Sequence, residues 1–409
     1  MSRSTPTRSP ATEFRQVAVI GGGIAGSVAA YYSARAGLST VLFEKTQGPQ
    51  HKVCGELLSA GAVASLRELG VDFKVLGAQR VRTLRLHGPL RSCESVLSEP
   101  AFGLSRWVLD EELLRIAAKA GAEIKRGVLV REMRDELEGD LGSMDGRIIL
   151  ETSAGEVDAK RLILASGKTG FRSVQSGIGR NGGMVAFKMH LKLKPSVYRK
   201  LLDHCDVFVF KGGYGSLVPI ENGLANFSFI IERRFLMETG TNWDSLAYYI
   251  AKNNLAASAS LDGAEPQFKH FVTISSVPYG FVRRERARPG IYFVGDQMAV
   301  IPFLAGDGMA IAAMTGKAAA SALIDANAIG QLLPPEYSAA YQKQMRVRIK
   351  PQIESSFALH LLFKNPQICD WATLVVKSFP HLTSRLFVRA SGRKPRLHLP
   401  SSDVKRLQV

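Results

Sequence analysis

The chain has 409 residues, a hydrophobic content of 46% and a formal net charge of +17. This length can bury a large core and favours two lobes rather than one. No stretch has the roughly 18 consecutive apolar residues that a membrane-spanning helix needs, so we expect a soluble or peripheral protein. The four cysteines form no Cys-x-x-Cys pair and the eight histidines show no metal spacing. We therefore expect no metal site, no disulfide framework and a cytoplasmic location.

The first predicted elements are a strand, a glycine turn and a helix. A Ser-, Pro- and Arg-rich stretch over residues 1–13 precedes them and is expected to be a disordered tail rather than a signal peptide, although a short organelle presequence would also fit it. Residues 17–20 are apolar and β-branched, as in a buried strand. They lead into a glycine-rich turn at 21–26 and an Ala-rich helix at 27–36, which Gly37 ends.

A Gly-x-Gly-x-x-Gly turn between a strand and a helix is typical of a dinucleotide pyrophosphate site. Here Gly21 permits the tight turn, Gly23 lets the backbone approach the pyrophosphate, and Gly26 lets the helix pack on the strand. The next strand, at 40–43, ends on Glu44, where an acid holds the adenosine ribose hydroxyls and repels a 2′-phosphate. The sequence thus favours FAD or NAD over NADP.

The remaining elements follow in chain order. Helices are expected near 59–69 and 109–120 and a buried strand at 161–165, and these complete the first part of the FAD-binding lobe, residues 14–182. Residues 183–278 alternate with period two, which predicts an inserted antiparallel substrate sheet. The second part of the lobe, 279–333, contains a strand at 291–296 and a helix at 308–326. The predicted fold is therefore α/β, a Rossmann-like FAD-binding lobe with an antiparallel-sheet substrate domain and a helical C-terminal tail.

The C-terminal region, residues 334–409, is predicted to be helical and basic. Its last 69 residues, 341–409, hold 13 Lys and Arg against 3 Asp and Glu. Such a region can rest on anionic lipid, bind nucleic acid or form a solvated surface. No nucleic-acid motif accompanies it, so nucleic acid is not an expected partner, whereas peripheral membrane contact stays open beside the solvated surface.

The strand at 291–296 favours FAD over NAD, because an NAD site does not require a second segment. Asp296, which ends this strand, would hold the ribityl hydroxyls. The loop through Gly306 reaches a helix start at which the N–H groups near Gly308 and Met309 would face the flavin N1 and O2 region. A strand-to-loop exit capped by an Asp is the simpler alternative.

These motifs, with Ser105-Arg106-Trp107 and Pro302, resemble the flavoprotein superfamily of para-hydroxybenzoate-hydroxylase fold. Three further segments are similar to its geranylgeranyl-reductase-like branch, near the flavin-dependent halogenases: residues 52–56, 214–219 and 278–280. The resemblance implies FAD contacts from Lys52 and Arg106, with Cys54 and Gly55 beside the isoalloxazine ring. It also implies a substrate roof that includes two further residues, Tyr214 and Pro219. The alternative explanations are that Lys52 and Arg106 are surface cations, that Cys54 is a small apolar filler, and that Tyr214 and Pro219 belong to the core of a sheet.

The resemblance has two departures. Aromatic hydroxylases of this fold carry Asp-Gly where this chain has Ser166-Gly167, which argues against direct, rapid reduction by NADPH. The Trp-x-Trp-x-Ile-Pro signature of tryptophan halogenases is also absent.

From these observations we predict an FAD-dependent oxidoreductase. It would act on an apolar, isoprenoid- or polyketide-like molecule by hydride transfer at flavin N5, with Cys54 or a water as proton partner and NAD(P)H or a separate partner as electron donor. A monooxygenase that uses a flavin C4a-hydroperoxide is the first alternative, because one fold hosts both chemistries. A flavin-bearing electron-transfer or binding protein is an alternative of another class.

Overall fold

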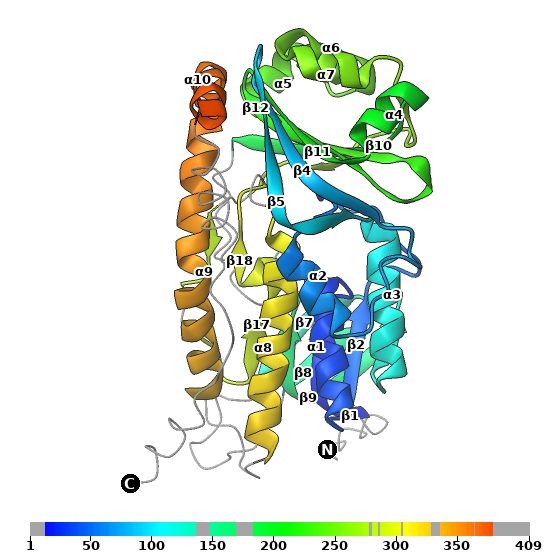
Figure 1. The fold of residues 1–409 in the computed structure, drawn as a ribbon. Coiled ribbons are helices and arrows are strands. Elements are labelled where there is room, and N and C mark those ends of the chain that lie inside the picture. Colours follow the sequence, from blue (N-terminus) through cyan, green and yellow to red (C-terminus); the bar gives the residue numbers. More distant parts are fainter. Residues whose placement is uncertain are drawn as a thin grey trace, which may run out of the picture.

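The structure is a computed structural model that describes residues 13–135, 148–168, 183–277, 280–284, 287–303, 306–328, 336–363 and 365–378. Nearly all of the predicted N-terminal tail lies outside these ranges, as do Pro278, Tyr279 and the chain beyond residue 378. Figure 1 shows two stacked sheets, with α9 (Glu336–Phe363) running along one side of both.

The lower sheet of Figure 1 is the predicted Rossmann-like lobe. In pairing order its strands are β6 (Glu123–Arg126), β2 (Thr40–Glu44), β1 (Glu13–Ile20), β9 (Gly155–Leu164), β8 (Ile148–Thr152) and β7 (Val130–Asp135), with β17 (Ile291–Phe293) also on β9. The strands β6, β2, β1, β9 and β17 pair in parallel, whereas β8 and β7 form an antiparallel edge.

Both faces of the parallel part of this sheet are covered, which explains why β2 and the C-terminal halves of β1 and β9 consist mainly of buried apolar residues. In β1, Val17 and Val19 point into the core beneath the helices, while Ala18 and Ile20 point into the core on the opposite face. The helices on the first face are α1 (Ile24–Arg35), α3 (Arg106–Lys119) and α8 (Gly308–Ala328), and α2 (Ala60–Arg67) packs against α8. The predicted strand–turn–helix order is therefore confirmed.

The upper sheet is larger than the sequence predicts. In pairing order its strands are β14 (Glu265–Pro266), β10 (Met184–Lys192), β13 (Ala225–Glu232), β12 (Gly213–Pro219), β11 (Asp203–Phe210), β4 (Gln79–His87), β5 (Ser92–Gly103) and β3 (Leu57–Leu58), with β15 (Val272–Ile274) also on β10. Residues 57–58 and 79–103 thus belong to this sheet, although the sequence assigned them to the first lobe. The strands β11 and β4 also pair in parallel, so the sheet is not wholly antiparallel.

The outer face of the upper sheet is closed by four helices that the period-two pattern did not predict. They are α4 (Pro195–Leu201), α5 (Arg233–Thr239), α6 (Trp243–Asn253) and α7 (Leu255–Leu261), and they cap the sheet at the top of Figure 1. Alternate residues of β10, such as Phe187 and Met189, pack into the core under these helices. The opposite face of the sheet is thereby turned towards the Rossmann-like lobe.

Short elements connect the two sheets. The strands β16 (Phe281–Val282) and β18 (Ala299–Val300) form a small antiparallel pair, and a 3₁₀ turn, η3 (Gly295–Gln297), follows β17. The C-terminal helices α9 and α10 (Pro366–Ser378) confirm the helical tail as far as residue 378. Within the described ranges, no helix combines the length and the hydropathy needed to cross a bilayer.

Candidate active site

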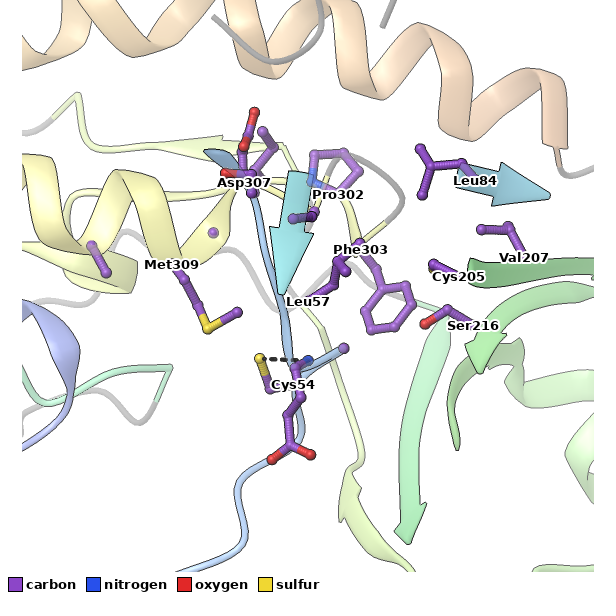
Figure 2. Close-up of a pocket in the computed structure, with 18 of the residues that line it drawn as sticks. Cys54, Leu57, Leu84, Cys205, Val207, Ser216, Pro302, Phe303, Asp307 and Met309 are labelled. Carbon is purple, nitrogen blue, oxygen red and sulfur yellow. Dashed lines mark hydrogen bonds between the residues drawn. The ribbon is translucent and has the colours of Figure 1, made fainter. Parts of the chain in front are cut away.

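A cavity of about 610 Å³ lies between the two sheets. The Rossmann-like lobe contributes the glycine turn, the loop around Cys54 and the start of α8, while the upper sheet and α9 supply mainly apolar side chains. Figure 2 shows the ring of Phe303 between Cys54 and Met309 on one side and Cys205 and Val207 on the other. The cavity therefore joins the predicted cofactor residues to the predicted substrate sheet.

The glycine turn has the geometry that its sequence predicts. Gly21 has a φ of +106°, which favours glycine, and a Cβ on Gly26 would lie 1.9 Å from the carbonyl oxygen of Gly21. No side chain caps the start of α1, and Gly23 and Ile24 line the cavity. This helix start therefore presents its positive end to the cavity, where a phosphate group would bind.

Two cationic side chains lie next to this turn. The Nη2 of Arg106 and the Nζ of Lys52 would lie 3.3 and 3.8 Å from a Cβ on Gly23. Both are held by Asp110, which accepts from Lys52 Nζ at 2.8 Å and from Arg106 Nε at 2.7 Å. Burial acts to raise the pKa of Asp110, but the two cations outweigh it and lower this pKa. Two positive charges share one carboxylate, so the excess charge suits the pyrophosphate of FAD.

Glu44 lies at the end of β2 beside the same turn. One carboxylate oxygen, Oε2, accepts a hydrogen bond from the Gly22 N–H at 2.8 Å, and Oε1 accepts from the Thr46 N–H at 3.1 Å. The side chain is almost fully buried. The carboxylate is therefore fixed beside the glycine turn, and its contact with an adenosine ribose stays a prediction.

The second cofactor segment also reaches the cavity. Asp296 lies in η3, lines the cavity and pairs with Lys168 at 3.7 Å. Gly306, with a φ of +66°, and the start of α8 at Gly308 and Met309 complete this wall. The two halves of the predicted FAD site thus face one cavity, and their backbone cradles and cations fit the group.

Cys54 lines the cavity together with Gly55. Its Sγ accepts a hydrogen bond from the Glu56 N–H at 3.4 Å, which Figure 2 marks with a dashed line. The Cys54 carbonyl oxygen accepts from Asn226 Nδ2 at 3.0 Å, which connects the loop to the upper sheet. Of the four cysteines, Cys54 alone is only partly buried.

The two predicted substrate residues have different positions. Tyr214 is fully buried, lines the cavity and shares a 2.9 Å hydrogen bond with Nδ1 of His360 on α9. Pro219 is not among the described residues that line the cavity. It ends β12 next to β5, where a Cβ on Gly103 would lie 1.9 Å from the Pro219 carbonyl oxygen. The same strand supplies Ser216 to the cavity instead.

Sequence reasoning missed a buried acid–base cluster at the edge of the cavity. Glu56 lines the cavity and bonds to Lys188 and His190 of β10, and all three side chains are almost completely buried. The signal was present in the sequence as charged residues within an apolar strand, but alternation alone assigns them to a solvated face.

Comparison with known proteins shows what this chain is similar to in sequence and in fold. A family model described as an NAD(P)-binding Rossmann-like domain matches residues 19–50. The digeranylgeranylglycerophospholipid reductase of Thermoplasma volcanium is 28% identical over 356 residues, which cover 83% of this chain and 85% of the relative.

Two solved structures are similar in fold. A geranylgeranyl bacteriochlorophyll reductase-like protein from Thermoplasma acidophilum has a TM-score of 0.74 at 21% identity, over 97% of this chain and 99% of the other. A probable FAD-dependent monooxygenase from Pseudomonas aeruginosa has a TM-score of 0.70 at 17% identity, over 89% and 100%. The predicted resemblance to geranylgeranyl-reductase-like flavoproteins and the predicted oxidoreductase class are confirmed.

Proposed function

We propose that this FAD-dependent oxidoreductase acts on an isoprenoid-like lipid by hydride transfer at flavin N5. The observation that carries the proposal is the apolar cavity between the glycine turn and the upper sheet, with Cys54 in its wall. The similarity to a reductase of an isoprenoid lipid supports the substrate class. When bound, FAD supplies the hydride chemistry, and the protein supplies binding, orientation and a dry environment.

The residues of the lower lobe would hold the cofactor. The helix start at Gly23, with Arg106 and Lys52, would bind the pyrophosphate, while Glu44 would accept hydrogen bonds from the ribose. Asp296 would hold the ribityl chain, and the start of α8 at Gly308 would stabilise negative charge at the reduced ring.

The upper wall of the cavity would select and orient the substrate. Val207 and Leu84 present aliphatic side chains to it, and Phe303 divides it from the cofactor side. Apolar walls exclude water, which favours a lipid chain over a polar ligand. Cys54 lines the cavity and would hold or donate a proton during the reaction.

Reconstitution and reduction test this proposal. The purified chain should bind FAD, and a screen of polyprenyl lipids and quinones should show one class that bleaches or restores flavin absorbance under anaerobic conditions. Assays with NADH, NADPH and dithionite would identify the reductant. A C4a-oxygen adduct on mixing reduced protein with air would instead establish a monooxygenase, and failure to bind FAD would refute both.

Two variants locate the chemistry within the site. Cys54→Ala should leave FAD bound and slow turnover; full activity would make Cys54 a packing residue. Glu44→Arg should weaken FAD retention, because it removes the ribose acceptor and places a cation against the Gly22 N–H. Unchanged affinity would remove Glu44 from the site.

Lipid substrates would reach the cavity most directly from a membrane surface. Leu361, Ile368 and Trp371 of α9 and α10 are 53%, 43% and 69% exposed, and Ile368 also lines the cavity together with Phe363. Residues 341–409 carry an excess of basic side chains. This combination favours an anionic lipid surface as the occupant of the exposed apolar face.

Vesicle sedimentation tests this contact. The full chain should bind phosphatidylglycerol vesicles better than phosphatidylcholine vesicles, and Leu361→Ser with Trp371→Ser should weaken that binding. Met237→Ser, which changes an 84% exposed side chain on α5, is the control and should have no effect. Equal binding by all variants would show that α9 and α10 do not contact lipid.

A further inference from the structure

The buried cluster around Glu56 is unusual in both its backbone and its charge. Glu56 has a φ of +54°, a left-handed conformation that costs free energy in a residue other than glycine. Its side chain is completely buried, as is that of Lys188. Such a conformation persists only where the surroundings hold it, so the contacts of Glu56 must favour it strongly.

The Glu56 carboxylate contacts two elements outside its own loop. Its Oε1 accepts hydrogen bonds from Lys188 Nζ and from the Arg106 N–H, the latter at 2.7 Å. Its Oε2 lies 2.7 Å from Nε2 of His190. One side chain therefore connects the loop around Cys54 to β10 of the upper sheet and to the start of α3 in the lower lobe.

The direction of β10 explains how charged residues reach this position. Lys188 and His190 are two residues apart, so they lie on the same face of the strand. The alternate residues Phe187 and Met189 face the core under the upper helices. The charged face is consequently turned towards the cavity side, where only an acid can neutralise it.

The cluster keeps Glu56 ionised. Burial acts to raise the pKa of Glu56, but the bond from His190 and the charge of Lys188 outweigh it and hold this pKa below its usual value. His51 in the preceding loop also interacts with the charges of this cluster. The backbone N–H of Arg106 donates to the carboxylate, whereas the Cys54 thiol contacts the backbone N–H of Glu56. An ionised carboxylate accepts stronger hydrogen bonds than a neutral one.

We infer that Glu56 is a positioning residue that fixes Cys54 in the cavity wall. The carboxylate holds the backbone of residue 56 in its left-handed conformation, and the N–H of that residue then donates to Cys54 Sγ. The same carboxylate binds the N–H of Arg106, whose guanidinium stands over the glycine turn. One buried residue thus contacts both the thiol and the backbone of the arginine whose guanidinium is held by Asp110. This inference concerns the protein alone and does not depend on the proposed substrate.

Alkylation of Cys54 in the full chain without cofactor tests the inference. Iodoacetamide labelling followed by peptide mass mapping separates Cys54 from the three buried cysteines. Glu56→Gln should label about tenfold faster than the wild type, because the loss of a charged hydrogen bond raises the open population of the loop by that order. FAD affinity should fall in the same variant, since the Arg106 N–H loses its ionised acceptor.

Glu221→Gln is the matched control. Glu221 is also a buried acid; it lies just after β12, and its Oε2 accepts from the N–H of Ser105, the residue before α3, at 2.9 Å. No hydrogen bond joins it to Cys54 within the described residues. It should alter stability without changing the labelling rate. Equal labelling rates for wild type and Glu56→Gln, or an equal rise in both variants, would overturn the inference.

A second variant keeps the test available should Glu56→Gln fail to fold. His190→Ala removes one of the three donors to Glu56 and leaves Lys188 and the Arg106 N–H in place. Labelling of Cys54 should rise in this variant as well, by less than in Glu56→Gln. An unchanged rate in a folded His190→Ala protein would also count against the positioning role.

Discussion

The cavity is flanked by two acid–base clusters that use similar side chains for different purposes. The phosphate-side cluster, Lys52, Arg106 and Asp110, has two cations for one carboxylate, and the Lys52 side chain is 35% exposed. The buried cluster, Glu56, Lys188 and His190, is almost wholly inaccessible. Excess charge beside an open glycine turn is suited to a ligand, whereas a sealed and paired charge is suited to holding the protein itself in place.

The largest expected effect comes from the turn beneath the phosphate-side cluster. Gly26→Ala puts a Cβ 1.9 Å from the Gly21 carbonyl oxygen, so α1 must move away from β1. FAD affinity should fall at least about 100-fold, equivalent to about 3 kcal/mol. Gly48→Ala, where a Cβ meets no atom within 4 Å, is the control. Fluorescence titration measures both, and retained affinity in Gly26→Ala would show that the turn does not bind the cofactor.

Removal of the buried cation Lys188 should affect the stability of the protein, in contrast to removal of a phosphate-side cation. Lys188→Met leaves Glu56 as a partly uncompensated buried charge and should lower the free energy of unfolding by about 3 kcal/mol. Glu56→Gln combined with Lys188→Met removes both charges and should recover part of that loss. Urea unfolding of the single and double variants measures the coupling. Purely additive effects would mean that the pair is not coupled.

Removal of a phosphate-side cation should affect binding more than stability. Arg106→Ala should weaken FAD binding by roughly 10- to 100-fold, which corresponds to the loss of a hydrogen bond to a charged group. Arg115→Ala changes an exposed arginine of the same helix that pairs with Glu112, and it should leave FAD affinity unchanged. If both variants bind alike, the cation over the glycine turn is not a cofactor contact.

The smallest effect concerns the pH dependence of stability beside the buried cluster. Burial and the nearby charges of Lys188 and His190 lower the pKa of His51 to about 4. A histidine with a lowered folded pKa stabilises the protein above its unfolded pKa of about 6.5, and that stability is lost as the pH falls towards 4. Because His51 is partly exposed, the loss should be about 1 kcal/mol.

His51→Gln tests this dependence. Between pH 7 and pH 4.5, the urea midpoint of unfolding should fall less in the variant than in the wild type. Both proteins share every other titrating group, so the difference between the two shifts is the contribution of His51. An identical pH shift in the two proteins would show that His51 does not contribute. The dependence of stability on pH would then come from the acids of the two clusters.

The sequence predicted the cofactor side because its signals are local. An apolar strand, three glycines and an acid at the next strand end lie within about 30 residues, and each is required by the backbone geometry of a single strand–turn–helix unit. The return segment around Asp296 was predicted for the same reason. Both segments line the same cavity, and this is the part of the site that could be predicted from the sequence.

The upper sheet was harder to predict because its pairing is long-range. Residues 79–103 join the sheet through β11, more than 100 residues later in the chain, and nothing near them in sequence indicates that partner. Lys188 and His190 alternate with apolar residues, a pattern typical of a half-solvated strand. They are buried because Glu56 lies opposite them in the folded chain.

The strand–turn–helix unit and the return segment around Asp296 could be predicted from the sequence, because short-range periodicity and glycine placement are fixed by backbone sterics. The place of Cys54 beside them was implied only by the family resemblance. Which charges face the cavity and which are sealed from solvent depends on the folded structure. That distinction depends on desolvation and on the partners that each side chain meets across the fold, and no local pattern contains this information.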